Sequence, residues 1–198
     1  MNAPHWHEPT VSREARWSTL GLRGMTLWIT GFSGSGKSTV AHELARQLLL
    51  AKTLAIVLDA DNLRHGLNAD LGFSDDDRRE NVRRVGEVAA LLADTGVVTI
   101  VPIISPFKEG REAVRALHQR AGLPFIEVHM ATSIDECASR DPKGLYRKVR
   151  DGEMTGLSGL DAPYEAPEAA DLVLGANGES VEDCVGSLIA AIRQVTTS

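Results

Sequence analysis

One eight-residue stretch constrains the fold of this chain more than any other: residues 31–38 read GFSGSGKS. They fit the pattern G-x-x-x-x-G-K-[ST], in which glycines let the backbone wrap around a phosphate group and the start of the next helix adds partial positive charge. The flanking residues fit as well, because 25–30 resembles a buried strand and 39–48 has the apolar spacing of an amphipathic helix. The sequence therefore predicts a phosphate-binding loop (P-loop) between a strand and a helix.

The P-loop predicts where the phosphates of ATP and a Mg²⁺ ion bind. Lys37 is expected to reach the β- and γ-phosphates, and the Ser38 hydroxyl is expected to ligate the Mg²⁺ that accompanies ATP. The alternative, a glycine-rich turn without a ligand, is disfavoured by the strand before it and the helix after it. The expected ATP-binding residues here are Gly31, Phe32, Ser33, Gly34, Ser35, Gly36, Lys37, Ser38 and Thr39.

Length and composition predict one α/β domain in residues 25–198, preceded by a polar leader in residues 1–24. The net charge of −6 argues against a nucleic-acid-binding surface. No apolar run approaches membrane-spanning length, and the first residues lack the apolar segment of a signal peptide. The two cysteines, Cys137 and Cys184, are too few for a disulfide framework, so we expect reduced thiols in a cytoplasmic protein.

Strand-like and helix-like segments alternate along the chain. Strands are expected at 25–30, 54–58, 97–104, 125–130 and 172–174. Such alternation is typical of a parallel sheet with helices on both faces, which predicts a P-loop NTPase-type, three-layer α/β/α fold with five strands. The continuously apolar run 54–58 is expected to be a strand buried on both faces.

Polar residues that could take part in binding or catalysis follow two of these strands. Asp59, Asp61 and Arg64 come after 54–58, at the carboxyl edge of the sheet where ligands of open α/β proteins bind. For Asp59, a helix cap and a functional role are equally compatible with the sequence. Ser105 follows 97–104, and that strand does not end in the aspartate that usually ligates the metal in P-loop proteins.

A helix is expected to begin after Ser74, whose side chain suits the N-cap position. Arg78 and Asn81 are three residues apart and share one side near its start. Arg79, Arg83 and Arg84 are interpreted as a solvated face paired with acidic residues.

Residues 141–150 form the most basic segment, and a glycine-rich loop without apolar periodicity follows at 152–167. A cationic, mobile lid over about residues 141–167, closing over phosphates, would explain both features. The alternative for any one of these cations is a solvent-facing basic helix.

Several stretches in order make the pattern more specific. Besides the P-loop these are DADNLRHGLN at 59–68, DLGFS at 70–74, RREN at 78–81, ISPF at 104–107, KGLY at 143–146 and PYE at 163–165. Together they resemble the adenylylsulfate kinase (APS kinase) family over nearly the whole chain from about His5 onward.

The resemblance implies transfer of the γ-phosphate of MgATP to the 3′-hydroxyl of adenosine 5′-phosphosulfate (APS). In this interpretation Asp61 orients the hydroxyl and accepts its proton, while Arg64 and Arg78 contact the phosphosulfate. Arg140 would lie near the adenine of ATP. The implied catalytic residues are Lys37, Asp61 and Ser105, and the implied acceptor-binding residues are Asp61, Arg64, Phe73, Arg78, Asn81, Ile104, Ser105, Pro106, Phe107, Lys143, Leu145 and Leu157.

The chain departs from the usual family pattern at three positions. Ala60 replaces a usual Gly, and Phe32 replaces a usual Leu. The larger change is Leu157, where the family typically has a Phe that forms the second aromatic wall around the acceptor adenine. The family label of a phosphoserine intermediate falls on Ser105, but we expect direct in-line transfer without a covalent intermediate.

Two alternatives to this function remain open from the sequence. One is a P-loop kinase of another small metabolite, and the other is a regulatory module that binds the nucleotide without turnover. The intact Lys37 and Ser38 argue against the second. The resemblance also implies a homodimer and a functional pairing with an ATP sulfurylase.

Overall fold

In a computed structural model, residues 5, 7 and 9–197 are described, and they contain a five-stranded, fully parallel sheet. The strand order is β2-β3-β1-β4-β5, so β1 lies in the middle of the sheet, between two strands that come later in the chain and do not follow it directly. This confirms the predicted number and direction of the strands. Their bounds are β1 Met25–Gly31, β2 Ala55–Val57, β3 Val98–Pro102, β4 Phe125–Met130 and β5 Leu172–Leu174.

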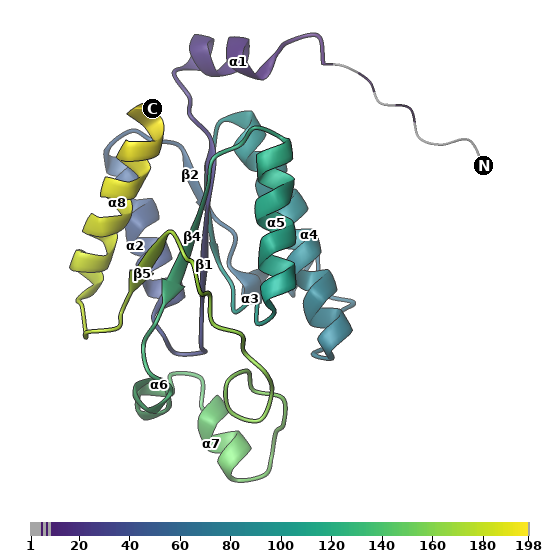
Figure 1. The fold of residues 1–198 in the computed structure, drawn as a ribbon, viewed down its shortest axis with the longest axis vertical. Helices are drawn as coiled ribbons and strands as arrows, with labels where there is room; N and C mark the ends of the chain where they lie inside the picture. The colour runs from purple at the N-terminus through teal and green to yellow at the C-terminus, as the bar shows by residue number, and fades with distance from the viewer. Residues whose placement is uncertain (1–4, 6, 8, 198) are drawn as a thin grey trace.

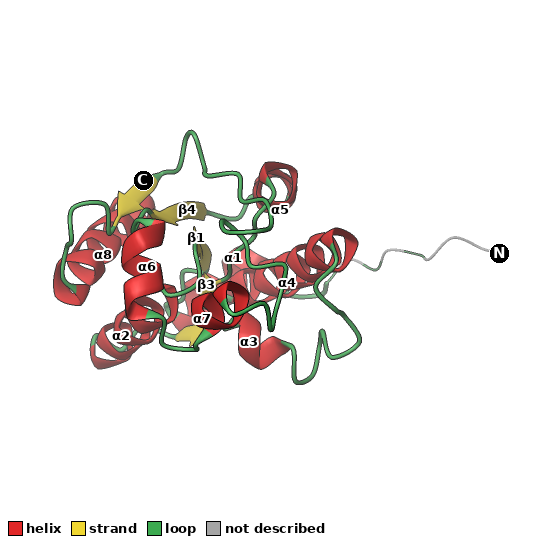
Figure 2. Cartoon of the chain, turned by 90° about the horizontal axis from the view of Figure 1, so that it is seen from below, coloured by secondary structure: helices red, strands yellow, loops and turns green. Residues whose placement is uncertain are grey.

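Helices cover both faces of the sheet, as the alternation predicts (Figures 1 and 2). In Figure 1, α2 and α8 lie on one side of the strands and α4 and α5 lie on the other. The helices are α1 Arg13–Leu20, α2 Lys37–Leu50, α3 Ala60–Leu63, α4 Asp75–Thr95, α5 Lys108–Arg120, α6 Ile134–Arg140, α7 Leu145–Arg150 and α8 Val181–Thr197.

The central strand β1 is buried along its whole length and divides the core in two. Leu27 packs on the α2 and α8 side, in a cluster that includes Leu44 and Leu188. Trp28, the next residue, packs on the α4 and α5 side with Val85 and other apolar residues. Successive side chains of a strand point to opposite faces, so one apolar strand supplies both layers.

The expectation for residues 54–58 is wrong in one respect. β2 is the edge strand of the sheet and, among the described strands, pairs only with β3. It is also not buried on both faces. The Ile56 side chain is 41% exposed. An apolar run is also compatible with a short edge strand. The neighbours of a strand depend on the strand order, and periodicity does not determine that order.

The boundaries of α4 and β3 have local causes, and the start of α4 after Ser74 is as predicted. The Ser74 side chain accepts a hydrogen bond from the backbone N–H of Asp77, and Gly96 ends the helix in the left-handed region with a φ of 103°. Pro102 is the last residue of β3, where its missing N–H interrupts nothing further.

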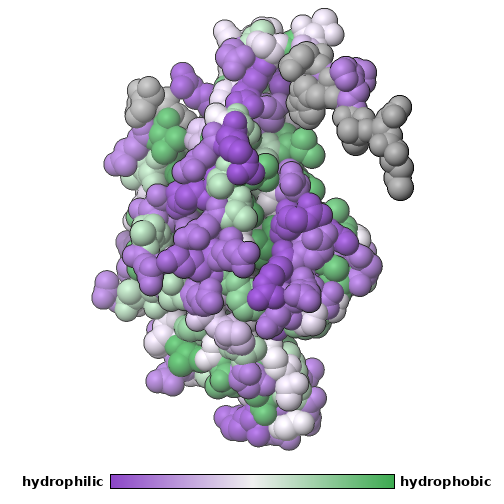
Figure 3. All heavy atoms as spheres, turned by 45° about the vertical axis from the view of Figure 1, so that its right-hand side comes forward, coloured by the Kyte–Doolittle hydropathy of each residue, from purple (hydrophilic) through white to green (hydrophobic). Residues whose placement is uncertain are grey.

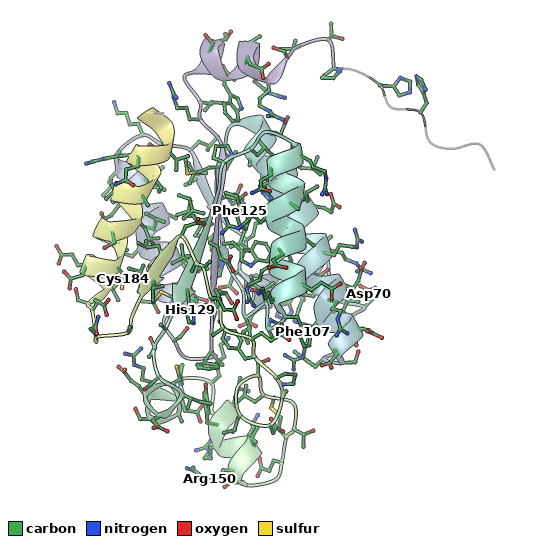
Figure 4. The ribbon with its side chains drawn as sticks, viewed as in Figure 1. Asp70, Phe107, Phe125, His129, Arg150 and Cys184 are labelled. Carbon is green, nitrogen blue, oxygen red and sulfur yellow. The ribbon has the colours of Figure 1, made fainter. Side chains whose placement is uncertain are left out.

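The carboxyl ends of all five strands meet at one edge, and α6, α7 and the following loop lie beyond that edge (Figure 1). Arg150, labelled in Figure 4, lies far from the sheet in this segment. We call residues 141–167 the lid, as in the sequence-based prediction. It is the part of the fold that can cover ligands bound at the strand ends.

Helix α1 lies at the opposite end of the sheet from the lid (Figure 1). Both Arg13 and Arg16 form ion pairs with Asp94 of α4, at 2.7 and 3.0 Å. The Trp17 indole N–H donates to the Asp94 carbonyl at 3.0 Å. This part of the leader is therefore fastened to the domain. Among the described residues, no helix has both the length and the apolar character needed to span a membrane.

Candidate active site

A cavity of about 670 Å³ lies at the carboxyl edge, between the P-loop, α3, the start of α4, the segment after β3 and the lid. Ligands of open α/β sheets bind at this edge. The predicted site residues that line it are Ser33, Gly34, Gly36, Lys37, Ser38, Thr39, Asp61, Arg64, Phe73, Arg78, Asn81, Ile104, Ser105, Pro106, Lys143, Leu145 and Leu157.

The P-loop has the backbone conformation that an anion cradle requires. Gly31 has a φ of 147°, and a Cβ atom at this position would lie 2.6 Å from the carbonyl oxygen of Met130. Lys37 is the first residue of α2, and its side chain folds back over the loop. Its ammonium donates to the carbonyls of Gly31 and Phe32, at 2.9 and 2.6 Å.

Burial lowers the pKa of Lys37 to about 8. The charged form loses hydration there, and the nearby Lys143 adds a smaller repulsion. Bound phosphate oxygens would favour the charged form again. The site therefore holds a cation that is poorly compensated until an anion arrives.

Asp59 is both a helix cap and a partner of the P-loop. One carboxylate oxygen accepts from the backbone N–H of Asp61 at 2.9 Å, and the other accepts from the Ser38 hydroxyl at 2.7 Å. A hydroxyl next to a carboxylate offers hard oxygen ligands of the kind that Mg²⁺ prefers. Within the described part of the chain, no cluster of three or more His, Cys, Asp or Glu side chains gathers around a metal position. Such a pair fits a Mg²⁺ that takes its remaining ligands from phosphates and water.

Asp61 faces the cavity from α3 and forms an ion pair with Lys143 of the lid. Both side chains are more than half exposed. The pair connects a carboxylate of the cavity wall to the lid.

Arg64 and Phe73 form a stacked pair at the cavity wall. The Arg64 guanidinium carbon lies 4.2 Å from the centre of the Phe73 ring. One N–H group of Arg64 also donates to the carbonyls of Leu71 and Gly72, at 3.2 and 2.9 Å. The Phe73 residue is 67% exposed, so much of the ring surface remains free for a planar ligand.

Arg78, on the first turn of α4, contacts the lid directly. Its guanidinium donates to the Ser158 hydroxyl at 2.7 Å and to the Gly156 carbonyl at 2.5 Å. A third N–H donates to the Phe73 carbonyl at 2.9 Å. Asn81, one turn further along, is buried and accepts from the side-chain amide of Asn68 at 2.9 Å. Its own amide N–H groups can then donate toward the cavity.

Ser105 follows β3 and is almost fully buried. Its hydroxyl accepts from the Trp28 indole N–H at 3.1 Å, and its φ of 41° is unusual for a residue other than glycine. The same cavity wall contains Ile104 and Pro106. The indole bond gives the hydroxyl a structural partner in addition to any ligand.

Leu157 is 4% exposed and packs in a small apolar cluster under the lid with Cys137 and Tyr146. The Tyr146 hydroxyl donates to the Ser33 carbonyl at 2.9 Å, which fastens the lid to the P-loop. Leu157 also contributes to the cavity lining. Its position is therefore shared between the lid's own core and the ligand space.

Five predicted site residues lie outside the cavity lining: Gly31, Phe32, Ser35, Phe107 and Arg140. The first three are loop positions whose backbone shapes the cradle. Phe107 lies at the end of α5 nearest the lid (Figure 4) and carries the Arg79 guanidinium 4.6 Å from its ring centre. Arg140 forms an ion pair with Glu136. For these two residues, ligand contact remains a prediction.

The same part of the chain matches a known protein family. Residues 23–175, which include the P-loop, the cavity walls and the lid, match the family model described as adenylylsulphate kinase. The chain belongs to the adenylylsulfate kinase family. The resemblance found in the motifs is thereby confirmed.

Individual proteins similar to this adenylylsulfate kinase family member support the same assignment. The probable adenylyl-sulfate kinase of Bacillus subtilis is 49% identical over 189 residues, covering 96% of this chain and 95% of the relative. The adenylyl-sulfate kinase of Clostridium kluyveri is 46% identical, covering 93% and 91%. Among solved structures, the Mycobacterium tuberculosis APS kinase in complex with AMPPNP and APS is 50% identical. Its TM-score is 0.84, with 87% of this chain and 99% of that one covered.

Several cavity residues of this adenylylsulfate kinase family member were not predicted as site residues, and the polar side chains among them are Asp59, His65 and Ser158. Asp59 carried a usable signal, because it ends a strand at the same edge as Ser38. Ser158 carried none, since it lies in a loop without periodicity and only the fold brings it to Arg78.

Proposed function

We propose that this protein transfers the γ-phosphate of MgATP to the 3′-hydroxyl of APS, giving 3′-phosphoadenylyl sulfate and ADP. The observation that supports it most is that one cavity brings together the P-loop, the carboxylates of Asp59 and Asp61, and three cations besides Lys37. Asp61, Arg64, Arg78 and Lys143 line the same space as Lys37. In the chemical step the acceptor oxygen bonds to the γ-phosphorus while the bond to the β-phosphate oxygen breaks.

The donor half of the cavity belongs to the P-loop. Backbone N–H groups and Lys37 hold the β- and γ-phosphates, which repay the burial cost of the ammonium group. Ser38 and Asp59 would hold Mg²⁺ through their adjacent oxygens. When bound, this ion supplies charge neutralisation on the phosphates.

The acceptor half requires a base and cations. Asp61 is an exposed carboxylate at the cavity wall, suited to orient the acceptor hydroxyl and to take its proton as the oxygen attacks. Lys143, now paired with it, is a cation that can turn to the transferring phosphate. Arg64 and Arg78 supply guanidinium groups for the phosphosulfate, and Phe73 offers a ring face for the adenine.

Ser105 acts in this proposal by position alone. Its hydroxyl is buried and bonded to Trp28, and direct in-line transfer needs no protein nucleophile. A hydroxyl at this place can still donate a hydrogen bond to a ligand, because its accepting bond to Trp28 leaves its hydrogen free.

The test follows 3′-phosphoadenylyl sulfate formation from MgATP and APS, with ADP release as a second readout. A panel of sugars, nucleosides and hydroxy metabolites serves as competing acceptors, and Lys37→Ala controls for contaminating kinases. We expect APS to be the only acceptor of the panel that is phosphorylated. Transfer to another acceptor at a higher kcat/KM would indicate a different metabolite kinase. Nucleotide binding without any transfer would indicate a regulatory module.

A homodimer, a cytoplasmic location and a functional pairing with an ATP sulfurylase belong to the same proposal. The cheapest of these to test is the dimer, by light scattering at several protein concentrations. A constant monomer mass at micromolar concentrations would contradict it.

A further inference from the structure

Arg111 is a buried guanidinium on α5, and it lies on the face of this helix that also buries Val114 and His118. Figure 3 turns the side of α4 and α5 forward, and hydrophilic residues cover most of the face it shows. Arg111 nevertheless has 2% of its surface exposed. A charge in such a place is costly unless it is paired and fully hydrogen-bonded.

The Arg111 guanidinium reaches three separate segments of the chain. It donates to Glu127 of β4 at 2.9 Å, which is its charge partner. It donates to the Ser105 carbonyl at 2.8 Å and to the Glu165 carbonyl at 2.6 Å. The first carbonyl belongs to the cavity wall and the second to the end of the lid. One planar group thus joins both to the central sheet.

The two segments that Arg111 joins also bond to each other. The backbone N–H of Glu165 donates to the Pro106 carbonyl at 2.8 Å, and the Glu165 carboxylate accepts from the N–H of Lys108 at 2.6 Å. Next to them, the Tyr164 hydroxyl lies 3.1 Å from the Thr30 hydroxyl. The wall at 104–106 and the lid stem at 163–165 therefore form one hydrogen-bonded unit, and Arg111 connects it to the sheet.

The wall needs such support because its backbone is strained. Ser105 has a φ of 41°, a conformation that persists in a residue with a side chain only when its surroundings fix it. The Trp28 indole fixes the Ser105 side chain, and Arg111 fixes its carbonyl. Without the guanidinium, the carbonyl would lose its partner in a buried position.

We propose that Arg111 is a positioning residue for the acceptor half of the site: it sets the cavity wall at Ser105 and the lid stem at Glu165 in one fixed relation. The inference rests on the proposed function for its kinetic consequence. The hydrogen bonds of Arg111 go to Glu127, Ser105 and Glu165 and not to the P-loop. We therefore expect a substitution of Arg111 to weaken binding of the acceptor and not of ATP.

Arg115 provides a matched control on the same helix. It shares Glu127 with Arg111, at 3.2 Å, and it also pairs with Asp171 at 2.7 Å. Both of these acidic partners lie away from Ser105 and Glu165, Glu127 in β4 and Asp171 just before β5. Arg115→Met therefore removes a cation from the same network and leaves the cavity wall attached.

The kinetic experiment compares Arg111→Met with Arg115→Met. For Arg111→Met we expect the KM for APS to rise about tenfold to a hundredfold, because a misplaced wall weakens acceptor placement. The dissociation constant for the ATP analogue AMPPNP should stay unchanged. Arg115→Met should leave both constants near wild type. Equal changes in the two variants, or weaker AMPPNP binding in Arg111→Met, would overturn the proposal.

Amide hydrogen exchange tests the positioning without reference to turnover. Exchange at residues 105–108 and 163–166 should accelerate in Arg111→Met and remain slow in Arg115→Met. Unchanged exchange there would overturn the proposal even with an active enzyme. An inactive wild-type protein would instead refute the proposed function. If Arg111→Met does not fold, Arg111→Lys, which keeps the charge beside Glu127 but lacks the planar fork, is expected to show the same pattern.

Discussion

Lys37, the expected phosphate-binding residue of the P-loop, illustrates how a buried cation can lower the stability of its own fold. Its pKa is about 8 in the folded chain, against an ordinary value of 10.5 in the unfolded chain. Between these values the unfolded chain binds more protons, so stability rises with pH from about 8 to 10.5. Below pH 8 both states are protonated and the full penalty remains.

This predicts that Lys37→Met stabilises the protein at pH 7. The gain is at most about 3 kcal/mol, from the size of the pKa shift, and the lost hydrogen bonds reduce it. Urea unfolding at pH 7 and at pH 10 measures it. The advantage should shrink at the higher pH. A variant less stable than wild type by the same amount at both pH values would contradict this account.

Asp59 and Asp61 are two residues apart, and we expect them to have different functions that kinetics can distinguish. Asp61→Asn should lower kcat by about 10²–10⁴-fold, because an amide cannot accept the acceptor proton, while ATP binding persists. Asp59→Asn should instead raise the Mg²⁺ concentration needed for half-maximal rate. Steady-state kinetics over a Mg²⁺ titration separates them. If Asp61→Asn mainly raises the Mg²⁺ requirement, the two assignments are reversed.

Phe73 and Leu157 are expected to meet the two faces of the acceptor adenine. Stacking is worth about 1–3 kcal/mol per base in other proteins, so Phe73→Ala should weaken APS binding markedly. Leu157→Phe should tighten it severalfold and leave ATP binding unchanged. Titration calorimetry with APS, in the presence of MgADP, measures both. Because Leu157 is also packed under the lid, a melting curve of each variant serves as the control.

Individual residues were predictable where local chemistry determined their place. The spacing of the P-loop predicted Lys37 and Ser38, and the side chain of Ser74 carried the signal for the start of α4. Predicting the Ser38 contact of Asp59, or the contact of Ser105 with Trp28, required the sheet order, because these partners are distant in sequence.

At the scale of elements, a small number of polar contacts hold the lid to the domain outside its stem at residues 163–165. Arg78 reaches Ser158 and Gly156, Lys143 reaches Asp61, and Tyr146 reaches Ser33. Arg78 is also expected to bind the acceptor. A ligand that draws Arg78 into the cavity therefore competes with a lid contact, so acceptor binding and lid position are coupled.

Ser158→Ala tests this coupling. It removes one of the three hydrogen bonds of Arg78 and should speed proteolytic cleavage within residues 152–160 several-fold in the absence of ligands, because local opening becomes easier. Limited proteolysis with and without APS plus MgADP provides the measurement. Ser187→Ala, on the distant helix α8, is the control. Equal cleavage rates in wild type and Ser158→Ala would show that this contact does not restrain the lid.

The elements themselves were largely predictable, and their environment was less so. The run 54–58 gave a strand at the right place but not its edge position. The burial of Arg111 was not predictable from the pattern of α5, because burial of a charge depends on partners such as Glu127, which lies on β4.

At the scale of the whole molecule, α1 and the candidate site occupy opposite ends of the sheet (Figure 1). Asp94 pairs with two arginines of α1, so Asp94→Ala should loosen this helix. Partly buried ion pairs of this kind contribute about 1–2 kcal/mol together, or about 2–8 °C in Tm for a domain of this size.

Differential scanning calorimetry measures that loss, with kcat and both KM values expected to remain at wild-type levels. Asp135→Ala, on α6, is the control for removal of an exposed acid. A large fall in kcat for Asp94→Ala would show that the leader communicates with the site.

The position of β1 in the middle of the sheet has a consequence for synthesis on the ribosome. β1 pairs with β3 and β4, strands that begin at Val98 and Phe125. Parallel pairs between distant segments form slowly. The strand that leads into the phosphate cradle therefore emerges early but waits, unpaired and apolar, until Met130 has left the exit tunnel. We expect the nascent chain to need protection from aggregation over this interval, and the nucleotide site to form only in its final part.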